Sequence, residues 1–337
     1  MRRRWILCCA GAIVLSLVIA GVGLAWFLMR PADPGGASAQ VFVVPVGAGF
    51  ADVAARLERE GFIKSRTAFI LWARAVGYSR SIKAGEYSFS PGMPPGKILE
   101  HLRRGMIVTH SVTIPEGVGL REMGGILEEL ELVDKDAFIS FCSDPKTAAA
   151  YGIDAPGLEG FLFPDTYRFS KGLPIRVIVD VMVKRFFEKV DPLRERIEET
   201  GMSLKQVVTL ASIIEKETGS PPERPMIASV FLNRIDKRMR LQSDPTAVYD
   251  IADFEGVITR KELKRRSPYN TYVVPGLPPG PICNPGVDSV RAVLEPAQTD
   301  FLYFVSKNDG THHFSKTLEE HNAAVQKYRK RSSGRVS

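Results

Sequence analysis

The hydrophobic pattern of the chain begins with one long apolar stretch. Trp5 to Met29 contains no charged residue, and three arginines precede it. These 25 uncharged, mostly apolar residues are more than a helix needs to cross a bilayer, and the arginines favour an N-terminus left in the cytoplasm. The pattern therefore predicts a cytoplasmic tip at residues 1–4 and a transmembrane helix at residues 5–29.

A cleaved signal peptide is the alternative interpretation, because Ala37-Ser38-Ala39 has the small-x-small form of a cleavage site. The apolar core of a signal peptide has about 7 to 15 residues and is shorter than this stretch. The candidate site also lies ten residues past Met29. We therefore favour an uncleaved single-pass anchor, with a linker at residues 30–40 and the rest of the chain outside the cytoplasmic membrane.

After the linker, the same pattern of hydrophobic and polar positions occurs twice. VFVVPVGAGFADVAARLEREGFIKSRTAFI from Val41 matches VTIPEGVGLREMGGILEELELVDKDAFI from Val112, and GEYSFSPGMP from Gly85 matches DTYRFSKGLP from Asp165. Each pass is typical of a strand ending in a Pro-x-Gly turn, two short helices, and an aromatic strand leading into another helix. The sequence predicts duplicated β-α-α-β units over residues 41–190.

The aromatic residues of the second strands allow two interpretations. Tyr87 and Phe89 in the first pass correspond to Tyr167 and Phe169 in the second. Exposed rings would lie against sugar faces, as in a carbohydrate-binding module, whereas buried rings would form the core of a stalk. We favour the core, because alternating aromatic residues suit the half-buried surface of a strand.

Between residues 203 and 217 the apolar positions follow a helix, and one acid interrupts them. At about 100° per residue, Leu210, Ile213 and Ile214 form an apolar face into which Glu217 projects. Glu215 points the other way, because residues two apart on a helix do not share a face. A carboxyl among aliphatic side chains has a raised pKa and keeps a proton near neutral pH. Alternatively, these are ordinary solvated charges at a helix end.

The flanking segments predict two more helices. The charged segment FFEKVDPLRERIEETGMSLKQ, from Phe186 to Gln206, is typical of an amphipathic helix that stops at Gly201. Ser203 can then cap the helix that carries the two glutamates. A further helix at residues 226–235 carries an apolar stripe, which is more often core than site.

Beyond residue 240 the chain becomes rich in Pro, Gly, Asn and Tyr, which is typical of loops around a cleft. For each polar residue in these loops, the sequence is as compatible with a turn-forming or capping role as with a contact with substrate. This holds particularly for Asp244 before Pro245. The candidates for sugar contact are Gln242, Asp244, Asn270, Tyr272 and Asn284.

Composition and charge add few chemical options. The net charge is +7, but three positive charges precede the apolar stretch and five lie in the tail KYRKRSSGR, so the middle is close to neutral and nucleic acid is not an expected partner. Cys142 and Cys283 could pair in an oxidising compartment or remain free thiols, and the histidines lack zinc-site spacing. We expect no metal and no cofactor. A polar helix at residues 316–330 precedes a basic tail at residues 331–337.

Five motifs, in order, resemble the endolytic murein transglycosylases of the YceG-like family. They are ASIIEKET, ERPMIASVFLNR, LQSDPTAVY, YNTYVVPGLPPGPICNPG and YFVSKNDGTHHFS. The resemblance extends from the anchor to about residue 330 and implies an α+β protein. Its parts would be a single-pass anchor, a LysM-like duplicated region at residues 41–190, and a mixed α/β catalytic domain at residues 191–330 with the acid on a helix. The second glutamate of the family's ASIIEKE motif is the essential acid and corresponds to Glu217.

The resemblance also implies a location, an activity and partners. It implies an enzyme in the bacterial cytoplasmic (inner) membrane whose catalytic domain lies on the periplasmic side. Such an enzyme cuts nascent glycan strands between N-acetylmuramic acid and N-acetylglucosamine and leaves a 1,6-anhydromuramic end, an activity that would terminate glycan elongation. The implied partners are peptidoglycan strands, the cytoplasmic membrane, and penicillin-binding proteins of the elongation or division machinery.

This mechanism requires one carboxyl. Glu217 would protonate the glycosidic oxygen and then take the proton of the muramic C6 hydroxyl, so no water molecule is needed. Two other hypotheses stay open. A hydrolytic muramidase would need a second acid roughly 5 to 10 Å from Glu217, with Glu223 and Asp244 as candidates. A non-catalytic scaffold would bind peptidoglycan without cutting it.

Overall fold

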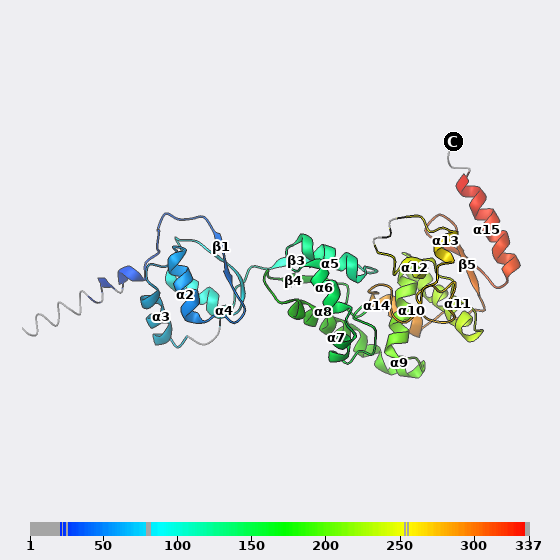
Figure 1. Ribbon diagram of the computed structural model, residues 1–337, viewed down its shortest axis with the longest axis horizontal. Helices are drawn as coiled ribbons and strands as arrows, with labels where there is room; N and C mark the ends of the chain where they lie inside the picture. Colours follow the sequence, from blue (N-terminus) through cyan, green and yellow to red (C-terminus); the bar gives the residue numbers. More distant parts are fainter. Residues whose placement is uncertain are drawn as a thin grey trace, which may run out of the picture. The chain divides into compact units, whose positions relative to one another are not determined.

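The structure is a computed structural model with mixed α+β architecture (Figure 1). It describes residues 21, 23–24, 26–78, 82–252, 254 and 256–333, and the side chains only as far as residue 328. The chain forms two compact units. Unit 1 runs to His110 and includes Arg168–Leu173, and unit 2 comprises Ser111–Tyr167 and the chain from Pro174 onward. The units therefore divide inside the region 41–190, and most of its second pass lies in the unit that contains Glu217.

The predicted membrane anchor falls largely outside the described residues. Within the described part of the chain, no helix combines the length and the hydropathy of a membrane span. The cytoplasmic tip and the transmembrane helix at residues 5–29 stay predictions.

Unit 1 is built on a two-stranded antiparallel sheet. Strand β1 (Gln40–Val44) pairs with β2 (Gly85–Phe89), with Gln40 opposite Phe89 and Val44 opposite Gly85. Three helices complete the unit: α2 (Phe50–Arg59), α3 (Arg66–Ala75) and α4 (Pro95–Arg104). Strand β1 alternates as expected for a half-buried strand, because Phe42 and Val44 face the core while Val41 and Val43 face solvent.

The aromatic residues that correspond between the two passes lie in the core. Tyr87 and Phe89 are fully buried, and Tyr167 and Phe169 are buried as well. The core interpretation of these rings is therefore confirmed, and they offer no exposed platform for a sugar.

The second pass has the expected order of elements with one helix added. Its elements are β3 (His110–Thr113), α5 (Leu120–Glu129), α6 (Lys135–Cys142), α7 (Pro145–Ala150), β4 (Thr166–Phe169) and α8 (Ile175–Val190). Strands β3 and β4 form a two-stranded sheet, and α7 has no counterpart in the first pass. The Pro-x-Gly turns agree in their backbone, because Gly47 and Gly117 both have a φ of +79°. This left-handed conformation favours glycine. The LysM-like character of the repeat stays a prediction.

The predicted charged helix from Phe186 to Gly201 is interrupted. Helix α8 ends at Val190, a short 3-10 segment (Asp191–Leu193) follows, and α9 (Arg194–Glu199) resumes. Proline lacks a backbone N–H and clashes with the preceding turn, so Pro192 breaks the helix that the charge pattern suggested.

The remainder of unit 2 surrounds one buried helix, α10 (Leu204–Glu217). Helix α10 packs against α11 (Arg224–Asp236) and α14 (Val287–Leu294), as Figure 1 shows. The other elements are α12 (Asp244–Val248), α13 (Arg260–Leu263), the antiparallel pair β5 (Tyr303–Ser306) and β6 (His312–Ser315), and α15 (Leu318–Ser333).

Candidate active site

Helix α10 positions the candidate acid at its last residue. Ser203 caps the other end, because its hydroxyl accepts from the N–H of Gln206 while the Gln206 side chain accepts from the N–H of Ser203, so the predicted cap is confirmed. Leu210, Ile213 and Ile214 are fully buried on the apolar face. Glu217 is half-buried. Its carboxyl therefore lies at the boundary between this core and solvent, which contradicts the alternative of an ordinary solvated charge.

Among the described residues, one side chain donates a hydrogen bond to the Glu217 carboxyl. The hydroxyl of Ser243 donates to Oε1 of Glu217 over 2.5 Å, and Oε2 has no such partner. Burial raises the pKa of Glu217 from its usual 4.5 to about 7. The hydrogen bond from Ser243 opposes this rise, the negative charge of Asp244 adds to it, and the positive charge of Arg234 opposes it. Glu217 therefore keeps a proton that it can release near neutral pH.

The turn that carries Ser243 is fixed by hydrogen bonds on both sides. The N–H of Ser243 donates to Oγ1 of Thr271 over 3.0 Å, and the N–H of Gln242 donates to the Thr271 carbonyl over 3.2 Å. Gln242 has a φ of +54°, an uncommon conformation for a residue with a side chain. Arg234 holds the preceding residue through Nη1, which donates to the Leu241 carbonyl over 2.6 Å. The Ser243 hydroxyl is therefore aimed at Glu217 by its surroundings.

Glu215 lies on a different face from Glu217, as the helical period requires, but it is not a solvated charge. Its side chain is 6% exposed and forms an ion pair with Arg224 over 2.9 Å. Its other oxygen accepts from the Gly286 N–H over 3.0 Å and from the Ser289 hydroxyl over 2.7 Å. Glu215 thus ties α10 to α11 and to the start of α14, which is a structural role.

Three of the five predicted sugar-contact residues lie around Glu217. Gln242 and Asp244 are exposed and flank Ser243. The Tyr272 hydroxyl donates to Oδ1 of Asp244 over 2.5 Å. Burial raises the pKa of this phenol, and the charges of Asp244 and Glu217 add to the rise, so Tyr272 stays protonated beside the acid. These three side chains are placed where a bound sugar could meet them.

The other two predicted contacts are corrected by the structure, because both are fully buried. The Asn270 amide donates to the Glu262, Leu263 and Arg265 carbonyls and accepts from the Tyr272 N–H. The Asn284 oxygen accepts from the Gly160 and Leu162 N–H groups, while its nitrogen donates to the Val118 carbonyl and to Glu159. Both asparagines use their hydrogen-bonding groups inside the protein, and they position loops rather than substrate.

Of the two candidates for a second acid, one is bound inside the protein and the other is exposed near Glu217. Glu223 is bound to His312, whose ring Nδ1 lies 2.7 Å from one carboxylate oxygen and whose N–H donates to the other over 2.8 Å. Glu223 therefore holds strand β6. Asp244 is exposed and close enough to raise the pKa of Glu217.

A further buried acid, Glu159, was not identified in the sequence. It is 8% exposed and accepts from the Leu120 N–H, from the Tyr249 hydroxyl over 3.1 Å and from Asn284 over 3.1 Å. Burial raises its pKa to about 7, against the opposing effect of the hydrogen bonds from Leu120 and Tyr249. No local pattern reveals this site, because its partners lie 39 to 125 residues away in the sequence.

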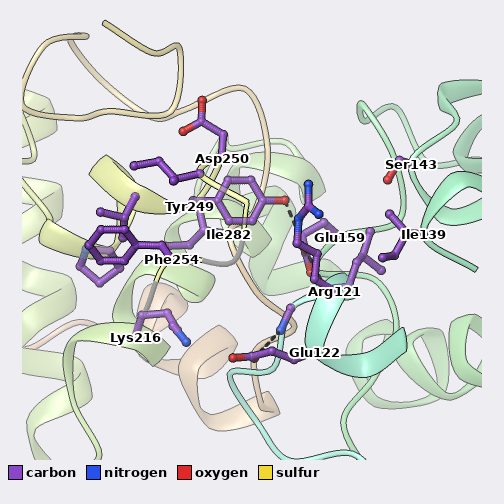
Figure 2. A pocket seen from close by; sticks show the side chains of 15 residues that line it. Arg121, Glu122, Ile139, Ser143, Glu159, Lys216, Tyr249, Asp250, Phe254 and Ile282 are labelled. Carbon is purple, nitrogen blue, oxygen red and sulfur yellow. Dashed lines mark hydrogen bonds between the residues drawn. The ribbon is translucent and has the colours of Figure 1, made fainter. Parts of the chain in front are cut away.

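A cavity of about 590 Å³ opens next to the Glu217 region (Figure 2). Glu217 itself does not line it, but Lys216 and Pro245 do, and these residues adjoin Glu217 and Asp244 in the chain. The opposite wall comes from the second pass of the repeat, through Arg121 and Glu122 at the start of α5 and through Glu159. The second pass therefore contributes to the same concave region as the predicted catalytic domain.

Neither a metal centre nor a disulfide occurs among the residues that the structure describes. No three side chains of the metal-binding types there come close enough to hold an ion. Cys142 and Cys283 are free and buried, so of the two alternatives for these cysteines the structure has the free thiols. Burial raises the pKa of both thiols and keeps them protonated.

Comparisons with known proteins agree on one family. The chain matches the YceG-like family over residues 42–327. It is 33% identical over 318 residues to the endolytic murein transglycosylase of Bacillus subtilis (strain 168), covering 89% of this chain and 88% of that protein. It is 27% identical over 316 residues to the endolytic murein transglycosylase of Streptococcus pneumoniae serotype 2, covering 84% of this chain and 57% of that protein.

A solved structure supports the same grouping. The crystal structure of a yceG-like protein from Listeria monocytogenes matches with a TM-score of 0.60 and 34% sequence identity, covering 85% of this chain and 99% of that chain. By its match over most of its length, the chain belongs to the YceG-like family.

Proposed function

We propose that this protein is a lytic transglycosylase that cuts peptidoglycan glycan strands, with Glu217 as the catalytic acid. One observation carries the proposal: a half-buried carboxyl whose pKa of about 7 leaves a transferable proton at neutral pH. Relatives named endolytic murein transglycosylases supply the substrate class. A scaffold that only binds glycan has no need of such a group.

The reaction uses the two states of one carboxyl. Oε1 is occupied by the Ser243 hydroxyl, so Oε2 delivers the proton to the glycosidic oxygen as the bond to the muramic C1 breaks. The carboxylate that remains then removes the proton of the muramic C6 hydroxyl while O6 bonds to C1. The products are a 1,6-anhydromuramic end and a free N-acetylglucosamine hydroxyl, and Glu217 ends protonated as it began. Attack from within the same sugar replaces a water molecule.

Hydrolysis is the second candidate, and Asp244 is the observation that favours it. This carboxylate is exposed and close enough to Glu217 to raise its pKa. A hydrolytic muramidase would use such a group as a base or a nucleophile. The Tyr272 hydroxyl donates to Asp244, and a carboxylate held in this way would also suit a contact with a sugar hydroxyl. We therefore assign Asp244 to substrate binding and keep its removal as a test.

The products distinguish these functions. Purified protein is incubated with peptidoglycan, and the muropeptides are identified by mass. We expect anhydromuramic ends that fall by roughly 100-fold or more in Glu217→Gln and persist in Asp244→Asn. Reducing ends that require Asp244 would establish hydrolysis instead, and an absence of new ends would leave only binding.

The control for Glu217→Gln must be chosen from the structure. Glu215→Gln would remove an acid two residues away, but it would also break the ion pair with Arg224. Glu199→Gln is the better match, because Glu199 is an exposed glutamate of α9 in the same unit. It should leave the yield of anhydromuramic ends unchanged.

We further propose that residues 5–29 anchor the protein in the cytoplasmic membrane, with both units on the periplasmic side. The arginines before this segment and its uncharged length support this topology. In this arrangement the LysM-like repeat would hold nascent strands, cleavage would terminate glycan elongation, and penicillin-binding proteins would be neighbours. Protease added to spheroplasts should degrade both units, and protection of either unit would contradict the topology. Co-purification that does not enrich penicillin-binding proteins would count against the partnership.

A further inference from the structure

We propose that the cavity beside Glu217 binds the peptide stem attached to the muramic sugar, and that Arg121 pairs with a carboxylate of that peptide. This inference rests on the proposed function, since it assumes a peptidoglycan substrate. It adds a second recognition element, built by the second pass of the repeat, to the site that would cut the glycan.

The position of the cavity fits an attachment on the muramic sugar. Lys216 precedes Glu217 on α10, and Pro245 follows Asp244, so the chain on either side of the candidate acid borders the cavity although the Glu217 side chain does not line it. A glycan held against Glu217 would carry its peptide on the sugar next to the cut bond. The cavity is therefore within reach of the peptide without containing the reacting atoms.

The walls of the cavity combine apolar and charged side chains. They include the aliphatic side chains of Leu120, Ile139, Val248 and Ile282 and the rings of Tyr249 and Phe254. The Tyr249 ring lies against Tyr269, with 4.6 Å between the ring centroids, and its hydroxyl donates to Glu159. Sugars present hydroxyl groups that need many polar partners, whereas a peptide stem alternates methyl groups with carboxylates. Aliphatic walls combined with a few charged groups match the second pattern.

The acidic side chains that line the cavity all have hydrogen-bond or ion-pair partners within the protein. Asp250 pairs with Arg265 and accepts from the Ser267 hydroxyl, and Glu159 accepts from several donors. Glu122 accepts from the Gly119 N–H. The acids of the cavity are therefore already engaged with donors from the protein.

The two cations of the cavity have no carboxylate partner among the described residues. Lys216 donates to the Gly117 carbonyl over 3.2 Å, and the guanidinium of Arg121 has no hydrogen bond or ion pair in the described part of the chain. Figure 2 shows both side chains on the wall of the cavity. A guanidinium presents a fork of donors that matches a carboxylate, which makes Arg121 the anchor for an acidic peptide.

The test compares strands that differ only in their peptides. The full-length wild type, Arg121→Gln, Arg121→Lys and the control Arg266→Gln are assayed on uncrosslinked strands with peptides and on strands from which an amidase has removed them. Arg266 is exposed and does not line the cavity. We expect the wild type to have a KM about tenfold lower for strands with peptides, because a hydrogen bond to a charged group typically contributes that much.

Arg121→Gln should abolish this preference without changing kcat or KM on the bare strands, and Arg121→Lys should restore part of it. A wild type that cleaves both substrates with equal KM would overturn the proposal, as would an Arg121→Gln variant that keeps the preference. Equal losses on both substrates would overturn it too, since they would show that the cavity binds sugar.

A failure of the proposed function is separable from a failure of this inference. If the wild type cuts neither substrate, calorimetric titration with the free tetrapeptide stem decides the matter. Binding by the wild type that is lost in Arg121→Gln and retained in Arg266→Gln would support the cavity as a peptide site. An absence of binding by the wild type would overturn it.

Discussion

Glu217→Gln is expected to stabilise the folded protein at alkaline pH. The pKa of Glu217 is about 7 in the fold against a usual value of 4.5, so between these two values the folded state binds more protons than the unfolded chain. The stability provided by the protonated carboxyl is fully present below pH 4.5 and is lost as the pH rises through 7. Glutamine carries no charge at any pH and therefore avoids this loss.

The magnitude follows from the pKa change. One pKa unit corresponds to about 1.4 kcal/mol, so a rise from 4.5 to about 7 corresponds to about 3 kcal/mol above pH 7. Solvent reaches the half-buried carboxyl, and screening reduces this figure to roughly 1–2 kcal/mol. The glutamine oxygen still accepts from the Ser243 hydroxyl, so that hydrogen bond does not offset the gain.

Urea unfolding at pH 5, 7 and 9 measures the effect. Circular dichroism is the suitable signal, because all three tryptophans precede residue 110 and would report on unit 1. The stability difference in favour of the variant should grow from pH 5 to pH 9 and reach roughly 1–2 kcal/mol at pH 9. Glu159 titrates in both proteins, so its contribution cancels. Glu199→Gln should show no such trend. A difference independent of pH, or a less stable variant at pH 9, would refute the reasoning.

Three further predictions concern the groups around Glu217. Glu215→Gln removes the closer of the two carboxylates that pair with the buried Arg224 and leaves Glu116 at 3.5 Å, so urea unfolding should show a loss of about 2–4 kcal/mol while activity per folded molecule persists; a loss below about 1 kcal/mol would count against the buried pair. Ser243→Ala should move the alkaline limb of the pH–rate profile up by about one pH unit, with Ser243→Thr restoring it, because the hydroxyl favours the ionised carboxyl; a downward move would contradict this role. Asn284→Ala should lose about 2–4 kcal/mol in the same unfolding assay without a change in KM, whereas a raised KM at unchanged stability would return this residue to substrate binding.

Local periodicity predicted the helices of unit 2 well where side chains from one face meet the core. The stripe that separated Glu217 from Glu215 follows from 100° per residue, and the Ser203 cap follows from its spacing to Gln206. The apolar helix expected at residues 226–235 appears as α11, with two extra residues at its start and one at its end. The charged segment does not form one continuous helix, because the missing N–H and the steric clash of Pro192 outweigh the helical charge pattern around it.

The contacts that define the site could not be derived in the same way. Ser243 meets Glu217 across 26 residues, and Asn284 meets Glu159 across 125. A polar residue in a turn-rich segment looks the same in the sequence whether it faces a cleft or closes a buried network. The sequence therefore does not distinguish the buried Asn270 and Asn284 from residues that contact substrate, and it does not reveal the buried Glu159.

The place of Glu217 at the end of α10 has a consequence for how its proton affinity could change during evolution. The carbonyl groups at a helix C-terminus together act as about half a negative charge, and this field disfavours a carboxylate in the last turn. The field belongs to the backbone, so no single side-chain replacement removes it. Substitutions that change the burial of the carboxyl, or that replace Ser243 or Arg234, would move the pH range of the acid, whereas the helix field would persist through all of them as a constant contribution of about 0.3–1 kcal/mol.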